Sequence, residues 1–260
     1  MGHPQVAAFA RLAKGGAKPT RSIAGQNTLF TRTMHDMAYD AVADEIIVPQ
    51  FFAFAILTFR GDADGNIPPL RKIFGPSTQL KLPQALAIDA VHGEIFVPQG
   101  ERVLVFPRSA NGDVAPIRIL GGPDSPVNGG RLTVDPVHDL LFASSNDGIR
   151  IYHRTAKGND KPIRTITGED AEGASLMTTN PASGMVFAAI RKEGRYEASD
   201  FVGIWSIYDN GNVPARWSVG GPNGVLKDIR GIAVDAKNKT VIASDKTLNA
   251  VLTFHVPEAF

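Results

Sequence analysis

One strand pattern occurs five times along this chain of 260 residues. Each copy has an apolar strand ending in an aromatic residue, then a polar turn with glycine, then a strand that begins Pro-x-Arg. The copies run from Val6–Phe9 to Pro19–Arg21, Ile56–Phe59 to Pro69–Arg71, Val103–Phe106 to Pro116–Arg118, Ile149–Tyr152 to Pro162–Arg164, and Val202–Trp205 to Pro214–Arg216. A sixth aromatic strand is Val251–Phe254, and successive aromatic positions lie 46 to 53 residues apart.

Two further strands are expected between one Pro-x-Arg strand and the next aromatic strand. The first ends in Asp or Asn, at Met37–Asp40, Leu86–Asp89, Leu132–Asp135, Met177–Asn180 and Ile232–Asp235. The second follows a tight turn, at Glu45–Val48, Glu94–Val97, Leu140–Ala143, Met185–Ala188 and Thr240–Ala243. Four short strands per unit at this period predict an all-β protein, a β-propeller of four-stranded antiparallel blades.

The strand count predicts five blades in a single domain over residues 1–260. The expected units are approximately 33–82, 83–129, 130–174, 175–228 and 229–260, the last closed by 6–32. Closing a ring with strands from both ends of the chain removes exposed edges, although one third strand is then left over. The alternative is six blades with one incomplete, because six complete units need roughly 290 residues at this period.

Two residue types recur at fixed places and are expected to be structural. The acidic or amide residue that ends each first strand can accept hydrogen bonds from the following turn, as in an Asx turn; these are Asp40, Asp89, Asp135, Asn180 and Asp235. The arginine of each Pro-x-Arg strand is expected to lie across an outer strand with its stem packed; these are Arg21, Arg71, Arg118, Arg164 and Arg216.

The repeat resembles that of bacterial NHL-like β-propellers. The resemblance is carried by Leu86–Asp89, Glu94–Val97, Val103–Phe106 and Asn111–Pro116, and it covers nearly the whole chain. It is strongest to the uncharacterised, mostly extracytoplasmic branch, and gluconolactonase-type propellers are more distant. The resemblance implies a propeller fold, but relatives include binding platforms, lactonases and lyases, so it leaves the activity open.

Composition excludes several classes of function. A net charge of +1 with scattered Lys and Arg is unlike the basic face of a nucleic-acid-binding protein. No apolar stretch approaches the length of a membrane span. The absence of cysteine excludes disulfides, thiolate metal sites and cysteine nucleophiles. We expect an extracytoplasmic location if an N-terminal segment was removed, and a cytoplasmic one otherwise.

The predicted binding site is the mouth of the central channel, where the loops before the first strand and after the second strand share one face. When the units are aligned, these loop positions hold different residue types. An asymmetric ligand would require such variation, but solvated positions that are free to vary would show it too. The candidates are His35, Asp36, Gln50, Gln84, Gln99, Arg131, Arg191 and Arg230. Arginines that bind a carboxylate or phosphate favour a non-catalytic platform for a small anionic or carbohydrate-like ligand, or for a protein partner, with no cofactor.

A metal-dependent hydrolase of lactonase or esterase type is the alternative, so the sequence leaves open whether the protein is an enzyme. Ca²⁺ or Zn²⁺ at the channel mouth would activate water or polarise a carbonyl. The candidate ligands are His35, Asp36, Asn146 and Asp245. No motif spacing supports them, and a three-histidine zinc site is not expected because His92 and His138 fall in turns on the opposite face.

Two loops depart from the repeat. Pro49–Phe54 places Phe51, Phe52 and Phe54 close together, and Arg191–Asp200 is an insertion before a third strand. Loops of this kind are typical of a ligand wall and lid or of a protein-binding surface. The alternative is that the phenylalanines pack between blades.

Overall fold

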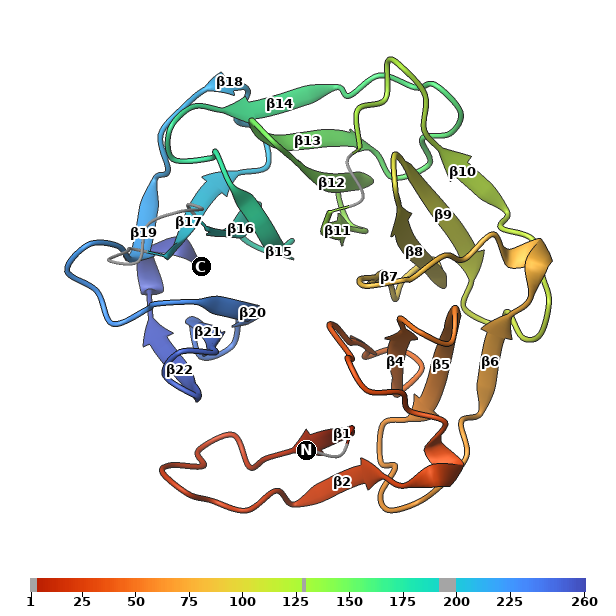
Figure 1. The fold of residues 1–260 in the computed structure, drawn as a ribbon. Helices are drawn as coiled ribbons and strands as arrows, with labels where there is room; N and C mark the ends of the chain where they lie inside the picture. Colours follow the sequence, from red (N-terminus) through yellow and green to blue (C-terminus); the bar gives the residue numbers. More distant parts are fainter. Residues whose placement is uncertain (1–3, 128–129, 192–199) are drawn as a thin grey trace. The chain divides into compact units, whose positions relative to one another are not determined.

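The computed structural model describes residues 4–127, 130–191 and 200–260. They form two compact units, of which unit 1 comprises 1–99 and 104–117 and unit 2 comprises 100–103 and 118–260. Short antiparallel strands make up both units (Figure 1). The helices of the described residues are 3-10 turns, at Gln26–Thr28, Pro76–Thr78 and Pro257–Ala259. None of them is long and apolar enough to cross a membrane.

Unit 1 holds a two-stranded sheet and a complete four-stranded meander. In the first sheet β1 (Gln5–Ala8) pairs with β2 (Arg21–Ala24). The meander follows chain order: β3 (Ala38–Asp40), β4 (Glu45–Gln50), β5 (Ala55–Arg60) and β6 (Arg71–Phe74). A second meander contains β7 (Ala87–Asp89), β8 (Glu94–Gln99), β9 (Arg102–Pro107) and β10 (Arg118–Leu120). The boundary between the two units falls within β9.

Unit 2 repeats the meander. One sheet contains β11 (Leu132–Asp135), β12 (Leu140–Ser145), β13 (Gly148–His153) and β14 (Arg164–Thr167), with β18 (Gly211–Asn212) added in parallel to β14. The next contains β15 (Ala174–Asn180), β16 (Met185–Ile190), β17 (Phe201–Ser206) and β19 (Trp217–Gly220). The last contains β20 (Ile229–Asp235), β21 (Thr240–Asp245) and β22 (Ala250–His255).

These sheets confirm the predicted fold class, an all-β protein built from propeller blades. Among the described residues, five sheets follow the meander in chain order, four of them with all four strands. The first strands of the last two sheets, β15 and β20, begin earlier than predicted, at Ala174 and Ile229. The pairing register shifts just after each of these residues, as at a β-bulge, and the pairing continues up to them. Closure of the last sheet by residues 6–32 stays a prediction.

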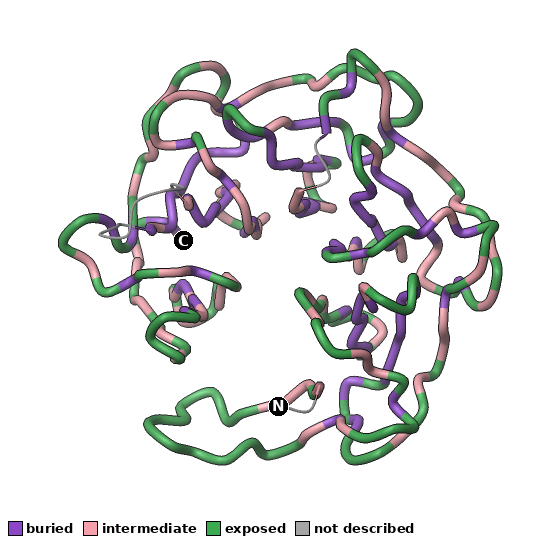
Figure 2. The backbone as a smooth tube through the Cα atoms, in the orientation of Figure 1, coloured by how far each residue is buried: buried purple, intermediate pink, exposed green. Residues whose placement is uncertain are grey.

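The core lies in the middle of each sheet. Buried positions concentrate in the second and third strands of the four complete sheets, whereas β22 of the last sheet alternates between half-buried and exposed residues (Figure 2). The third-strand aromatic is fully buried in four sheets, as Phe59, Phe106, Tyr152 and Trp205. Each such side chain contributes on the order of 1.5–3 kcal/mol through removal from water, which explains why the pattern of apolar strands identifies the fold so directly.

The acidic residues that end the first strands have the predicted structural role. Oδ1 of Asp40 accepts hydrogen bonds from the backbone N–H groups of Val42 and Ala43 at 2.9 and 3.0 Å. Asp89 and Asp135 bind the following turn in the same way and also contact the ring Nδ1 of His92 and His138, at 2.8 and 2.9 Å. Both histidines are therefore turn residues, as the sequence predicts.

The glycine turn of each repeat fastens a sheet to the one before it. Gly65 forms a parallel bridge with Ile23, and Oδ1 of Asn66 accepts a hydrogen bond from the backbone N–H of Asn27 at 2.8 Å. Gly65 has φ +78°, a conformation that favours glycine. The same bridge joins Ile73 to Gly112 and Leu120 to Gly158. This turn explains the recurrent Gly and Asn or Asp of the repeat.

Candidate functional site

The predicted site residues divide between the two units. Unit 1 contains His35, Asp36, Gln50, Gln84 and Gln99, and unit 2 contains Arg131, Asn146, Arg191, Arg230 and Asp245. The structure therefore defines the arrangement of each group within its own unit. Their assembly around one channel mouth stays a prediction.

Gln50 and Gln99 hold the loops that enter the first strands. Oε1 of Gln50 accepts a hydrogen bond from the backbone N–H of Thr31 at 2.7 Å, and Oε1 of Gln99 accepts one from that of Lys81. Each amide also donates to the carbonyl of its preceding proline, at 3.2 and 3.0 Å. Both side chains are buried. These contacts give the two glutamines a structural role.

Asp245 occupies the equivalent place in the last sheet and makes an equivalent set of contacts. Its Oδ2 accepts hydrogen bonds from the backbone N–H groups of Lys227 and Asp228 at 2.6 and 3.0 Å, and its Oδ1 accepts one from Leu248 at 2.9 Å. Burial acts to raise the pKa of Asp245, but these donors outweigh it and hold the pKa below its usual value. Asp245 thus fixes the loop that enters the first strand of its sheet, as Gln50 does in another sheet, although the two residues differ in type.

Arg191 and Arg230 come together on one carboxylate that the sequence analysis did not single out. Asp228 lies 3.4 Å from the guanidinium of Arg191 and 3.0 Å from that of Arg230. Arg230 is therefore engaged by a partner within its own unit. The backbone N–H of Arg131 donates to Oγ of Ser144 at 2.9 Å, at the entry to β11.

Asp200 lies beside this group and is the other carboxylate that the sequence analysis missed. Burial raises the pKa of Asp200, and the charges of Asp228 and Asp245 raise it further, against the backbone N–H of Ile229 and the charge of Arg191. The hydrogen bond from Ile229 measures 2.9 Å. The rest of the predicted lid, 192–199, lies outside the described residues.

The turn between β4 and β5 forms an exposed aromatic surface in unit 1. Phe51 packs edge-on against both His35 and Phe52, with ring centroids 5.5 and 4.9 Å apart. The Arg32 guanidinium lies 5.7 Å from the centre of the Phe52 ring. Phe52 is 50 % exposed and Phe54 49 %. The alternative that these two phenylalanines pack between blades is therefore wrong. We call Arg32, His35, Phe51 and Phe52 the aromatic surface.

Phe54 closes this turn in an unfavourable backbone conformation. Its φ is +50°, in the left-handed region that costs a residue with a side chain roughly 1–2 kcal/mol. The corresponding turns before β9 and β22 place Gly100 and Asn249 in that region, with φ +58° and +49°, and these residue types tolerate it. Other residues with side chains, such as Leu29, Thr33 and Leu82, have φ values of +60°, +73° and +49°, so Phe54 shares this strain with several turns of the chain.

The remaining candidates have local contacts or are exposed. The carboxylate of Asp36 accepts hydrogen bonds from the backbone N–H groups of Met37 at 2.9 Å and Leu86 at 3.3 Å. Gln84 and Asn146 are exposed. Across the described ranges, no group of three or more His, Asp or Glu side chains is placed to hold a metal ion. The metal site at His35, Asp36, Asn146 and Asp245 stays a prediction.

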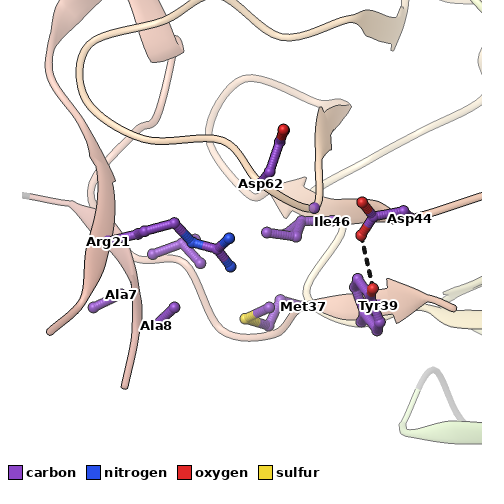
Figure 3. Close-up of a pocket in the computed structure, with 10 residues that line it drawn as sticks. Ala7, Ala8, Arg21, Met37, Tyr39, Asp44, Ile46 and Asp62 are labelled. Carbon is purple, nitrogen blue, oxygen red and sulfur yellow. Dashed lines mark hydrogen bonds between the residues drawn. The ribbon is translucent and has the colours of Figure 1, made fainter. Parts of the chain in front are cut away.

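A cavity of about 430 Å³ in unit 1 was not predicted. It lies between β1 and the neighbouring β3–β4 hairpin, and Arg21 extends into it (Figure 3). Its apolar lining includes Val6, Ala7, Ala8, Met37 and Ile46. Tyr39 lines it as well and donates its hydroxyl hydrogen to Asp44 at 2.7 Å. The only sequence signal for the cavity is Arg21, which the repeat marks as an outer-strand residue.

Comparisons with known proteins support the fold and no family. No protein-family model and no curated protein matches the sequence. Hydrazine synthase of Kuenenia stuttgartiensis is a structural match with TM-score 0.59 and 11 % identity, covering 82 % of this chain and 56 % of that one. This chain therefore spans little more than half of that relative's length.

The β-propeller domain of Cps50 (Swd1) from Myceliophteria thermophila matches with TM-score 0.58 and 12 % identity, covering 88 % of this chain and 67 % of that one. At such identities the likeness shows the β-propeller fold alone. The relationship to NHL-like or gluconolactonase-type propellers stays a prediction.

Proposed function

We propose that the protein is a non-catalytic binding platform that docks a partner protein on the aromatic surface. The observation that carries the proposal is the turn of Phe51 to Phe54, which leaves large apolar side chains in solvent and keeps one of them in a left-handed conformation. Strain retained at a surface turn points from the outlier to a function. Clustered exposed apolar side chains are typical of an interaction site.

The composition of the surface favours a protein over a small ligand. The aromatic surface lies on an open turn, whereas small-molecule sites are concave and enclose most of their ligand. Aromatic residues and arginine are enriched at the centres of protein interfaces. Arg32 above Phe52 and His35 beside Phe51 supply both kinds of side chain in one place. A small anionic or carbohydrate-like ligand remains the alternative partner.

The hydrolase alternative gains no support from the described residues. Gln50, Gln99 and Asp245 use their oxygens to accept hydrogen bonds from the backbone. Asp228 forms ion pairs with Arg191 and Arg230. No specific observation therefore favours a second function, and the assignment of Ca²⁺ or Zn²⁺ to this site stays a prediction.

Site-specific photocross-linking tests the platform. A photoreactive phenylalanine analogue replaces Phe52 in one variant and Tyr208 in the control, because Tyr208 is also an exposed aromatic residue on a turn, 67 % exposed. The partner that is cross-linked through position 52 is then purified and titrated against the wild type, the double variant Phe51→Ala/Phe52→Ala, and Tyr208→Ala.

We expect the double variant to weaken binding at least about tenfold, the loss typical of removing an interface hot spot, and Tyr208→Ala to leave it unchanged. Equal cross-linking at both positions, or equal affinity of all three proteins, would overturn the proposal. Binding of a small ligand that is unaffected by the double variant would do so too.

A further inference from the structure

Asparagine is followed by glycine at three places among the residues that the structure describes, at 111–112, 210–211 and 223–224. A fourth pair, 128–129, lies outside them. In such a pair the backbone nitrogen of the glycine can attack the side-chain amide carbon of the asparagine and expel ammonia. The resulting succinimide ring takes up water and opens to aspartate or to isoaspartate. Glycine favours this reaction because it has no side chain and the most backbone freedom.

The first pair belongs to a glycine turn that fastens one sheet to the sheet before it. Oδ1 of Asn111 accepts a hydrogen bond from the backbone N–H of Lys72 at 3.0 Å. The N–H of Gly112 donates to the backbone carbonyl of the same Lys72 at 2.8 Å. Although Asn111 is exposed, the side-chain amide and the attacking nitrogen are therefore both held by one residue of a neighbouring sheet.

The second pair is held in a similar way. Oδ1 of Asn210 accepts a hydrogen bond from the backbone N–H of Thr165 at 3.0 Å, and Gly211 lies in β18, which pairs in parallel with β14. Asp64 occupies the equivalent position of another turn and accepts the corresponding hydrogen bond from Ser22 at 2.8 Å. Since a carboxylate makes the same contact, the contact is a property of the turn and not of asparagine.

The third pair lies in the exposed loop between β19 and β20. The side chain of Asn223 is exposed and makes no hydrogen bond with any residue that the structure describes. The N–H of Gly224 donates within the same turn, to the carbonyl of Gly221 at 2.8 Å. A bond inside an exposed turn opens at low free energy, whereas bonds between sheets open only when the sheets separate.

We propose that Asn223 is a site of spontaneous deamidation in the folded protein, and that the contacts between sheets protect Asn111 and Asn210 from the same reaction. The nitrogen of Gly224 loses its proton and bonds to the amide carbon of Asn223, and the amide group leaves as ammonia. One water then opens the ring at either carbonyl, so the step consumes water and needs no other reactant. The modification is separate from the aromatic surface and does not depend on it.

The two products act differently on the loop that enters β20. Aspartate changes one exposed side chain, whereas isoaspartate adds a carbon atom to the main chain. The loop is fixed at both ends, because the backbone N–H of Gly221 donates to the carbonyl of Asp200 at 3.3 Å and that of Lys227 to Asp245 at 2.6 Å. Isoaspartate is therefore expected to strain the loop and to lower Tm relative to the variant Asn223→Asp, which has the same charge.

Peptide mapping by mass spectrometry measures the reaction. The full chain is incubated in mildly alkaline buffer below its Tm, beside synthetic peptides of residues 108–116, 207–215 and 220–228. Relative to their peptides, Asn111 and Asn210 of the folded chain should be slowed at least about tenfold more than Asn223, because their hydrogen bonds to the neighbouring sheet must break first. Methyl labelling by an isoaspartyl methyltransferase should locate isoaspartate at position 223.

Two variants test the protection. Lys72→Pro removes the donor to Asn111 and Thr165→Pro the donor to Asn210, each from an N–H group at the outer edge of its strand, where proline is tolerated. Each variant should accelerate deamidation of its own asparagine and leave the other asparagine, the internal control, unchanged.

Three results would overturn the proposal. In the first, Asn223 stays intact while its peptide is converted. In the second, all three asparagines of the folded chain react as fast as in their peptides, a comparison that decides even if the proline variants do not fold. In the third, a folded proline variant leaves the rate at its own asparagine unchanged.

Discussion

At the residue scale, the two buried aspartates Asp200 and Asp245 differ in the hydrogen bonds and charges that surround their carboxylates. Asp200 accepts one backbone hydrogen bond and faces the charges of Asp228 and Asp245, whereas Asp245 accepts three. Burial acts on both, yet it raises the pKa of Asp200 and is outweighed at Asp245. The two residues therefore make opposite contributions to stability at neutral pH.

Replacing Asp200 by Asn is expected to stabilise the protein at neutral pH. The raised pKa means that the contribution of Asp200 is fully present below its ordinary value of 3.8 and is lost as the pH rises through the folded value. Asparagine keeps an acceptor for Ile229 without the charge. Thermal melts should show Tm higher by about 2 °C at pH 7 and no gain near pH 3. A lower Tm at pH 7 would contradict the assignment.

Replacing Asp245 by Asn should have the opposite effect. The amide presents a donor to N–H groups that already donate, so we expect a loss of about 1–2 kcal/mol at pH 7. The lowered pKa means that this contribution is present above the ordinary value of 3.8 and is lost as the pH falls through the folded value. Urea unfolding at pH 7 and at pH 2–3 checks both. An Asn variant as stable as the wild type at pH 7 would exclude the structural role.

At the scale of elements, the sequence predicts what the repeat determines and misses what depends on a neighbouring strand. The third-strand aromatics and the acidic turn residues were predicted, because each follows from local pattern and burial. The common role of Gln50 and Asp245 was not, because residues of different type make the same backbone contact. The cavity at Arg21 was missed as well, because it depends on how β1 lies beside the β3–β4 hairpin.

The glycine turn that joins successive sheets can be tested at Gly112. Its φ is +80° and it bridges Ile73 of the preceding sheet. An added Cβ has space there, so Gly112→Ala should destabilise through backbone strain alone, by about 1–2 kcal/mol. Gly16→Ala, at a loop glycine with equal space and no left-handed φ, is the control. Equal free energies of unfolding for the two variants would show that the turn does not hold the conformation described.

At the scale of the whole molecule, the repeat predicts the β-propeller class and leaves function to the positions that break it. The turn of Phe51 to Phe54 was noted as an irregular loop, but its exposure and the backbone strain at Phe54 could be seen only in the structure. The grouping of Arg191 and Arg230 on Asp228 likewise required a fold, since Asp228 has no repeated pattern. The site is therefore less predictable than the scaffold that carries it.

Phe54→Gly tests the central claim most directly, because the platform predicts opposite changes in two quantities. Glycine relieves the strain at φ +50°, so the free energy of unfolding should rise by roughly 1 kcal/mol. Loss of the aromatic side chain beside the aromatic surface should weaken binding of the partner cross-linked through position 52 by about tenfold. A variant that is more stable and binds that partner as tightly as the wild type would contradict the account.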